Sequence, residues 1–94
     1  MNLLGEFAIV RTHSAGVHLG TLAEWSGTCV ILTNARRLWR WRGAYTLHEV
    51  SRAGVMTGSR ISEPVPVIAL TQAIEIIPCS EEARKNLEVS RWDP

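Results

Sequence analysis

Hydrophobic and polar positions along the first half of the chain follow the two-residue alternation and β-branched enrichment that are typical of strands. This pattern predicts strands over residues 7–12, 17–25 and 28–33, with a continuation over 36–42 after a bend at 34–35. Small and polar residues at 13–16 and 26–27 separate the strands as turns. Gly20 interrupts the second strand, which predicts the bulge or tight bend that small barrels need.

Two helix start signals lie in the second half of the chain. Thr46 and Glu49 have the spacing of a capping box, which predicts a helix over 47–53 that ends at Gly54. Ser80 is the expected N-cap of a second helix over 81–89, whose first turn is acidic.

Apolar runs between these helices predict two further strands, over 67–70 and 73–77, joined by a bend at 71–72. Residues 60–62 are a candidate for one more short strand, and Pro66 favours an edge position for the strand beside it. The predicted order is therefore β-β-β-α-β-β-α. We expect a single domain over residues 1–94, of the α+β class. Its architecture would be a small, strongly bent antiparallel sheet that closes into an SH3-like β-barrel with two short helices.

Composition narrows the class of protein. The 94 residues contain no apolar run of the roughly 18–20 residues that a membrane span needs, and the first residues lack the basic start of a signal peptide. Cys29 and Cys79 have no second cysteine or histidine at metal-ligand spacing, so we expect free buried thiols and neither a metal nor another cofactor. These features indicate a protein of the reducing cytoplasm without a membrane partner.

The net charge of +1 conceals a strongly basic middle segment. Residues 36–60 contain six arginines and one acid, a local net charge of +5, and Lys85 is the sole lysine of the chain. Arginine suits phosphate recognition and ring stacking better than lysine does, so this segment indicates an anionic ligand. The alternative is that these arginines pair with the acidic residues of 61–94, within the chain or between subunits.

The most concentrated chemistry of the sequence lies at residues 36–42. On a strand, Arg37, Trp39 and Trp41 share one face, while Arg36, Leu38, Arg40 and Arg42 lie on the other. Indole rings beside guanidinium groups provide stacking for a base and forks for phosphate. We therefore take as candidate ligand-binding residues Arg36, Arg37, Trp39, Arg40 and Trp41. The alternative interpretation makes the tryptophans core residues and the arginines their rim.

A second candidate is the polar turn between the first two strands. Its backbone N–H groups and the side chains of Thr12, His13, Ser14 and His18 could contact a ribose or a phosphate, although a plain turn is the commoner outcome. Ser14 with a histidine is no triad, because neither an orienting acid nor an oxyanion hole is apparent. Paired carboxylates and Gly-rich phosphate loops are also absent from the sequence, so we expect no catalytic residues and a protein that is not an enzyme.

Three stretches of the sequence, at 9–18, 32–41 and 73–79, together resemble a family of short uncharacterised proteins encoded by tailed phages and prophages. The resemblance implies a phage-encoded protein that acts inside a bacterium. Other small phage proteins counter host defence, and some of them sequester cyclic-nucleotide or ADP-ribose-type immune signals. A fainter resemblance to Sm-like barrels rests on Gly20-x-Leu22 and on the apolar strand at 28–33 that ends at Asn34. The acidic position of Sm proteins is missing.

These observations lead to three hypotheses of function. The first is a binding protein that sequesters a small anionic nucleotide and so counteracts host anti-phage defence. The second is an Sm-like RNA- or DNA-binding barrel that uses the same residues. The third is a structural or interaction protein whose basic segment meets an acidic partner surface. In each case we expect a homo-oligomer, because the extended apolar segment at 64–77 predicts an exposed patch for a second copy.

Overall fold

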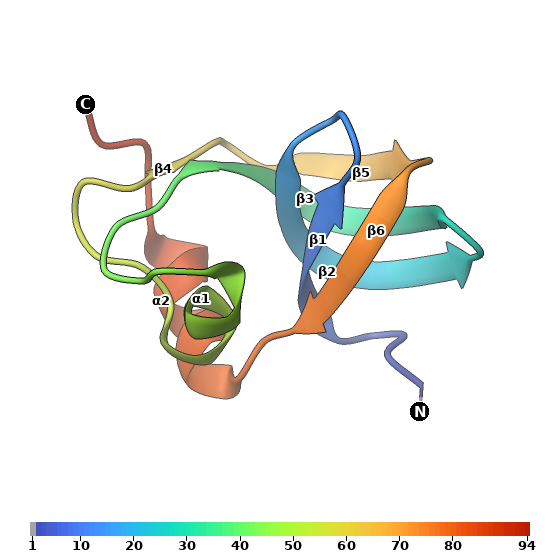
Figure 1. The fold of residues 1–94 in the computed structure, drawn as a ribbon, viewed down its shortest axis with the longest axis horizontal. Coiled ribbons are helices and arrows are strands. Elements are labelled where there is room, and N and C mark those ends of the chain that lie inside the picture. Colours follow the sequence, from blue (N-terminus) through green and yellow to red (C-terminus); the bar gives the residue numbers. More distant parts are fainter. Residues whose placement is uncertain (1) are drawn as a thin grey trace.

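A computed structural model describes residues 2–94, which form six strands and two helices (Figure 1). The elements are β1 (Phe7–Thr12), β2 (Val17–Ser26), β3 (Cys29–Arg40), α1 (Leu47–Ala53), β4 (Arg60–Ile61), β5 (Val65–Leu70), β6 (Ala73–Pro78) and α2 (Glu81–Val89). The predicted α+β class is confirmed. Figure 1 shows the two helices side by side at one end of the molecule, next to the sheet.

All strand pairs of the sheet are antiparallel, in the order β4-β3-β2-β1-β6. Strand β5 also pairs with β3, along Val30–Ala35, whereas β4 pairs with the opposite end of β3 at Leu38 and Arg40. The predicted closure into an SH3-like barrel is wrong, because β5 and β6 are not paired in the described part of the chain. The bend between them carries the chain across to β1, where Gln72 accepts a hydrogen bond from the His13 amide at 2.9 Å.

The sheet bends where Gly20 faces β3. A Cβ atom at Gly20 would lie 2.8 Å from the Thr33 carbonyl oxygen, and the pairing register shifts between Leu19 and Thr21. On the other strand Asn34 has a positive φ of 50°. The predicted bulge and bend are both confirmed, although β3 continues through Asn34 as one strand and ends at Arg40, so that Trp41 and Arg42 lie beyond it.

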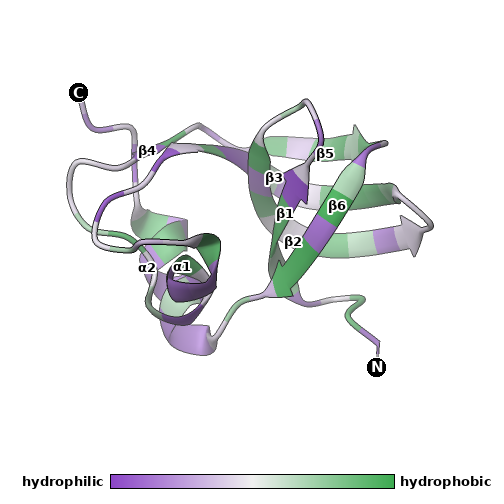
Figure 2. Cartoon of the chain, in the orientation of Figure 1, coloured by the Kyte–Doolittle hydropathy of each residue, from purple (hydrophilic) through white to green (hydrophobic). Residues whose placement is uncertain are grey.

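The bent sheet separates two clusters of buried side chains. One lies between the sheet and the helices and includes Phe7, Ile9, Leu38 and Leu87. The other fills the bend on the opposite side, where Val10 and Leu32 are fully buried. Figure 2 shows hydrophobic residues along the strands, whereas α1 and the loops beside it carry more hydrophilic ones.

Both helices begin and end at the predicted residues. Thr46 and Glu49 form the complete capping box of α1, and the Ser80 hydroxyl accepts a hydrogen bond from the Ala83 amide at the start of α2. These bonds satisfy amides that would otherwise lack a partner. Neither helix is long and apolar enough to cross a membrane, among the residues described here.

Candidate nucleotide-binding surface

From Arg36 to Trp39, β3 separates its side chains onto two faces, as the alternation predicts, whereas Arg40, expected on the face of Arg36, is exposed and follows a shift of register between Leu38 and Arg40. Arg36 and Leu38 are buried, whereas Arg37 and Trp39 are exposed. Neighbouring arginines on one strand therefore meet opposite environments, because successive side chains of a strand point to opposite sides of the sheet.

Arg36 is bound to main-chain carbonyl groups. Its Nε donates to the Ser62 oxygen at 2.7 Å and its Nη1 to the Leu87 oxygen at 2.8 Å, while its Nη2 donates to the Ser90 oxygen. The carbonyls at the end of α2 lack partners within the helix, and a cation near them also favours the helix dipole. Arg36 thus has a structural role in joining β3, the segment after β4 and the exit of α2, which differs from the phosphate fork that we predicted.

The two tryptophans of the basic segment also differ. Trp39 is 56 % exposed. Trp41 lies after the end of β3 and packs, half-buried, against the core cluster that includes Leu47 and Val50. The stacking interpretation therefore fits Trp39, and the core interpretation fits Trp41.

Trp39 belongs to an exposed cluster that we call the tryptophan platform, formed by Trp39, Arg60 and Trp92. The ring centroids of Trp39 and Trp92 lie 5.3 Å apart, with 31° between the ring planes. The Arg60 guanidinium carbon lies 5.2 Å from the centroid of Trp39 and 5.5 Å from that of Trp92, within cation–π range. Three segments that are distant in sequence thus meet at one surface.

Strand pairing and hydrogen bonds between these segments hold the platform in place. Arg40 of β3 pairs with Arg60 of β4, and Arg60 forms a further bridge with Trp92. The Arg60 Nε donates to the Asp93 oxygen at 2.8 Å, and the Asp93 carboxylate accepts from the Gly58 amide at 2.7 Å. The sequence analysis missed Arg60 and Trp92 as site residues. The sequence around Trp92 holds one adjacent arginine, Arg91, and the position of Trp92 on this surface depends on tertiary contacts.

The polar turn between β1 and β2 is closed by its own hydrogen bonds. The Thr12 hydroxyl donates to the Gly16 oxygen and accepts from the Ala15 amide, both at 2.8 Å. The Ser14 hydroxyl donates to Gln72 Oε1 at 2.6 Å, and the buried His18 Nε2 donates to the Ala15 oxygen at 2.9 Å. Thr12, Ser14 and His18 thus use their side chains to stabilise the turn, while the His13 side chain is exposed.

Arg37 lies between this turn and the platform. A Cβ atom at Gly16 would lie 3.9 Å from Arg37 Nε, and His18 is the strand partner of Arg37. Burial lowers the pKa of His18; the hydrogen bond with Ala15 raises it, and the charge of Arg37 lowers it further. The net effect lowers the pKa of His18 and so favours its neutral form. The structure brings Arg37 close to the turn on the same strand face as Trp39.

Arg37 and Arg40 are exposed and form no ion pair within residues 2–94. The ion pairs within residues 2–94 are Arg11–Glu75, at 3.2 Å, and Arg84–Glu88, at 3.4 Å. Neither pair includes an arginine of the segment 36–60, so pairing of that segment with the acidic residues of its own chain is not what the structure shows.

The arrangement suits recognition of flat anions. The platform offers indole faces with the Arg60 guanidinium beside them, and two further exposed arginines, Arg37 and Arg40, lie on the same end of β3. Within the described residues, no three His, Cys, Asp or Glu side chains gather as a metal site would require. Burial raises the pKa of the Cys79 thiol to about 12, so this thiol is a poor nucleophile.

Comparison with known proteins places the chain in a family. Neither the curated proteins nor the solved structures include a match to this chain. A family model does match, over residues 5–87, which is most of the chain and includes Trp39 and Arg60. This match shows that the chain belongs to an uncharacterised family, as expected. The origin in a phage stays a prediction. The chain belongs to the family described as a domain of unknown function, DUF6948.

Proposed function

We propose that this protein binds an anionic nucleotide at the tryptophan platform. The observation that carries the proposal is the contact of two half-exposed indole rings with the Arg60 guanidinium lying close to both. Exposed large aromatic rings are unfavourable in water unless a partner covers them, and stacking on an aromatic ring contributes about 1–3 kcal/mol per base.

The geometry indicates where the base would lie. Bases stack about 3.4 Å apart, so a base between two rings needs the rings roughly 7 Å apart. Trp39 and Trp92 are closer than that, at 5.3 Å. The base therefore stacks on an outer face of the pair. Within residues 2–94 the terminal nitrogens of Arg60 make no hydrogen bond, so they are available to a phosphate next to the stacked base.

The biological role that we propose is sequestration. The resemblance to small phage-encoded proteins supports a ligand of the cyclic-nucleotide or ADP-ribose type, an immune signal whose capture in the cytoplasm of an infected bacterium would counteract host defence. A binding protein needs no catalytic group for this role, and the polar groups of the β1–β2 turn are occupied by structural bonds.

A second candidate is binding of single-stranded RNA or DNA. The observation that favours it is the open position of the platform, because exposed stacking surfaces beside arginines suit an extended strand as well as a small molecule. Salt separates the two candidates. Affinity for a polynucleotide should fall by orders of magnitude between roughly 50 and 200 mM salt, whereas a ligand with few phosphates should respond much less.

The experiment is a calorimetric titration with cyclic dinucleotides, ADP-ribose and short single-stranded RNA at fixed salt. Trp39→Ala and Trp92→Ala should each weaken binding by about 1–3 kcal/mol. Trp25→Ala is the matched control, because Trp25 is also half-exposed but lies near the tip of the β2–β3 hairpin, which Figure 1 places far from β4. If a ligand binds the parent protein and both platform variants with equal affinity, the proposal is wrong.

Substitution of arginine by lysine tests the phosphate contacts separately from stacking. Arg37→Lys and Arg60→Lys keep the charge but lose the planar fork, so they should reduce affinity for a phosphate-bearing ligand. Arg52→Lys on the exposed surface of α1 should have no effect. If Arg37→Lys and Arg60→Lys bind the ligand as tightly as the parent protein does, Arg37 and Arg60 contribute only general surface charge.

A further inference from the structure

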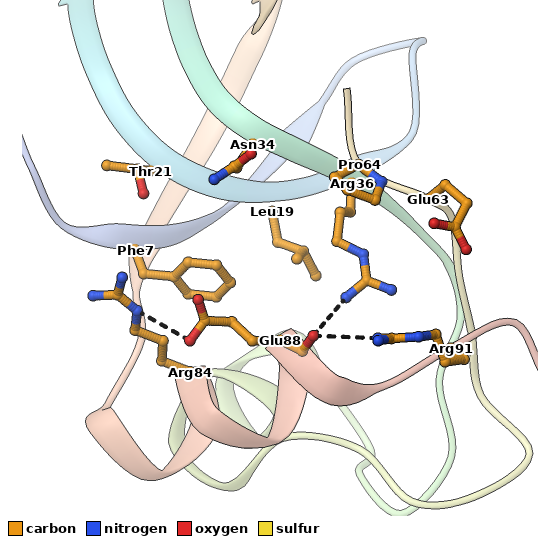
Figure 3. Close-up of a pocket in the computed structure, with 10 residues that line it drawn as sticks. All are labelled: Phe7, Leu19, Thr21, Asn34, Arg36, Glu63, Pro64, Arg84, Glu88 and Arg91. Carbon is orange, nitrogen blue, oxygen red and sulfur yellow. Dashed lines mark hydrogen bonds and ion pairs between the residues drawn. The ribbon is translucent and has the colours of Figure 1, made fainter. Parts of the chain in front are cut away.

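A concave surface lies away from the platform, between α2 and the sheet (Figure 3). The cavity has a volume of about 330 Å³, which is at the lower end of the range for small-molecule sites. Phe7, Leu19 and Pro64 form its apolar part. Its polar part contains three arginines, Arg36, Arg84 and Arg91, and two acids, Glu63 and Glu88.

Positive charge in this cavity exceeds what its carboxylates neutralise. Arg36 is 93 % buried, yet its partners within residues 2–94 are carbonyl oxygens and no carboxylate lies within ion-pair distance. Arg36 and Arg91 both donate to the main-chain oxygen of Glu88, at 3.4 Å and 3.3 Å, as Figure 3 shows. Two guanidinium groups are therefore held together around one neutral acceptor.

Burial and the nearby charge of Arg91 both disfavour the charged form of Arg36. Burial lowers the pKa of Arg36 and the nearby charge of Arg91 lowers it further, while Glu63 raises it. The Glu88 carboxylate is already paired with Arg84. An anion entering the cavity would relieve the repulsion between Arg36 and Arg91, because its charge would be close to both.

Asn34 adds a free polar group to the cavity wall. Its positive φ of 50° is a conformation that few residues other than glycine adopt, and its side-chain amide makes no hydrogen bond with residues 2–94. Thr21 lies next to it in the wall, on β2 (Figure 3). Both residues sit at the bend of the sheet, so the bend that Gly20 permits also shapes the cavity.

We propose that this cavity binds a small organic anion, whose carboxylate or phosphate monoester group meets Arg91 and Asn34 while its apolar body lies on Phe7 and Pro64. The site is separate from the tryptophan platform. Arg91 lines the cavity and the adjacent Trp92 stacks on Trp39, and neighbouring side chains of an extended segment point to opposite sides. The proposal therefore stands independently of the proposed function.

The test is an NMR titration of the nitrogen-15-labelled protein with benzoate and with phenyl phosphate. Benzamide is the neutral control and benzylamine the cationic one. Benzoate or phenyl phosphate should give saturable shifts of the Asn34 side-chain amide and of the Thr21 and Leu19 amides. Arg91→Gln should weaken that binding about tenfold or more, because a charge-assisted hydrogen bond is lost. Arg52→Gln, on the surface of α1, is the matched control.

Two further variants keep the outcome decisive. Asn34→Gly removes the amide but suits the positive φ, so it should weaken anion binding without unfolding the chain. Trp39→Ala should leave anion binding unchanged. Equal shifts with benzamide and benzoate would overturn the proposal, and so would shifts centred on the platform or the absence of any saturable shift with both anions.

Discussion

The two faces of β3 use the same residue types for opposite purposes. On the buried face, Arg36 satisfies carbonyl groups at the end of α2 and after β4, and Leu38 belongs to the core. On the exposed face, Arg37 keeps its guanidinium in solvent and Trp39 stacks with Trp92. A run of arginine and tryptophan residues in a sequence therefore need not form one site. Successive side chains of a strand point to opposite sides of the sheet, so some of them are buried in the fold and others lie on the surface.

The comparison also separates two kinds of energetic contribution. A buried guanidinium stabilises the fold when every carbonyl near it would otherwise lose its partner. An exposed guanidinium contributes little to stability, but it is free to meet a ligand. Substitutions on the two faces should accordingly change different measurements.

The largest expected effect is on the buried face. Arg36→Met leaves the carbonyls of Ser62 and Leu87 without their side-chain donor, and the Ser90 carbonyl keeps only Arg91, so the free energy of unfolding should fall by about 3–5 kcal/mol. Arg37→Met should change it by less than about 0.5 kcal/mol. Urea unfolding followed by circular dichroism measures both. If both variants lose a similar amount of unfolding free energy, the buried and exposed faces of β3 do not differ in their contribution to stability.

A smaller effect should separate the two tryptophans. Trp41→Ala should destabilise the protein by about 2 kcal/mol, below the 3–5 kcal/mol of a fully buried tryptophan, because Trp41 packs half-buried on the core. Trp39→Ala should remove about 1 kcal/mol of ring stacking. Thermal unfolding of both variants is the measurement. A larger loss for Trp39 than for Trp41 would make the platform a structural cluster.

The smallest effect should be on the pH dependence of stability. The pKa of His18 is lowered in the fold by burial and by Arg37, although the Ala15 hydrogen bond raises it. Below the ordinary value of 6.5, the unfolded chain takes up a proton that folded His18 resists. Stability should therefore be complete above this pH and fall as the pH is lowered through it.

Urea unfolding at about pH 5 and about pH 8 tests this dependence. His18→Gln should flatten the change in unfolding free energy between the two, whereas His48→Gln, on the exposed surface of α1, should leave it in place. Arg37→Gln should weaken it, because one cause of the lowered pKa is removed. An unchanged slope in His18→Gln would refute the assignment to His18.

The helices and most strands could be predicted from the sequence because their signals are local. Thr46 with Glu49 and Ser80 with its acidic first turn define both helices within a few residues. The alternation from Arg36 to Trp39 likewise separates the two faces of β3 correctly. Closure of the barrel could not be predicted in the same way, because it depends on whether β5 pairs with β6 or whether each remains on its own partner strand.

The candidate site could be predicted only in part. The alternation separates Arg36 from Arg37 but does not say which face is buried, and the Leu87 carbonyl that binds Arg36 lies 51 residues away. Trp39 was found because it lies in a dense basic segment. Arg60 and Trp92 reach the platform through pairing with β3 and with each other, so no spacing in the sequence connects them.

The pairing of β1 with β6 has a consequence for how the chain folds. Arg11 and Glu75, which form an ion pair across these strands, are 64 residues apart in sequence. Such distant pairing slows folding, because the entropy of a long loop is lost before the contact is gained. During synthesis the edge of β1, with Ile9 and Val10, has no partner until β6 leaves the ribosome. That interval is when the nascent chain is most exposed to pairing with other strands and to aggregation.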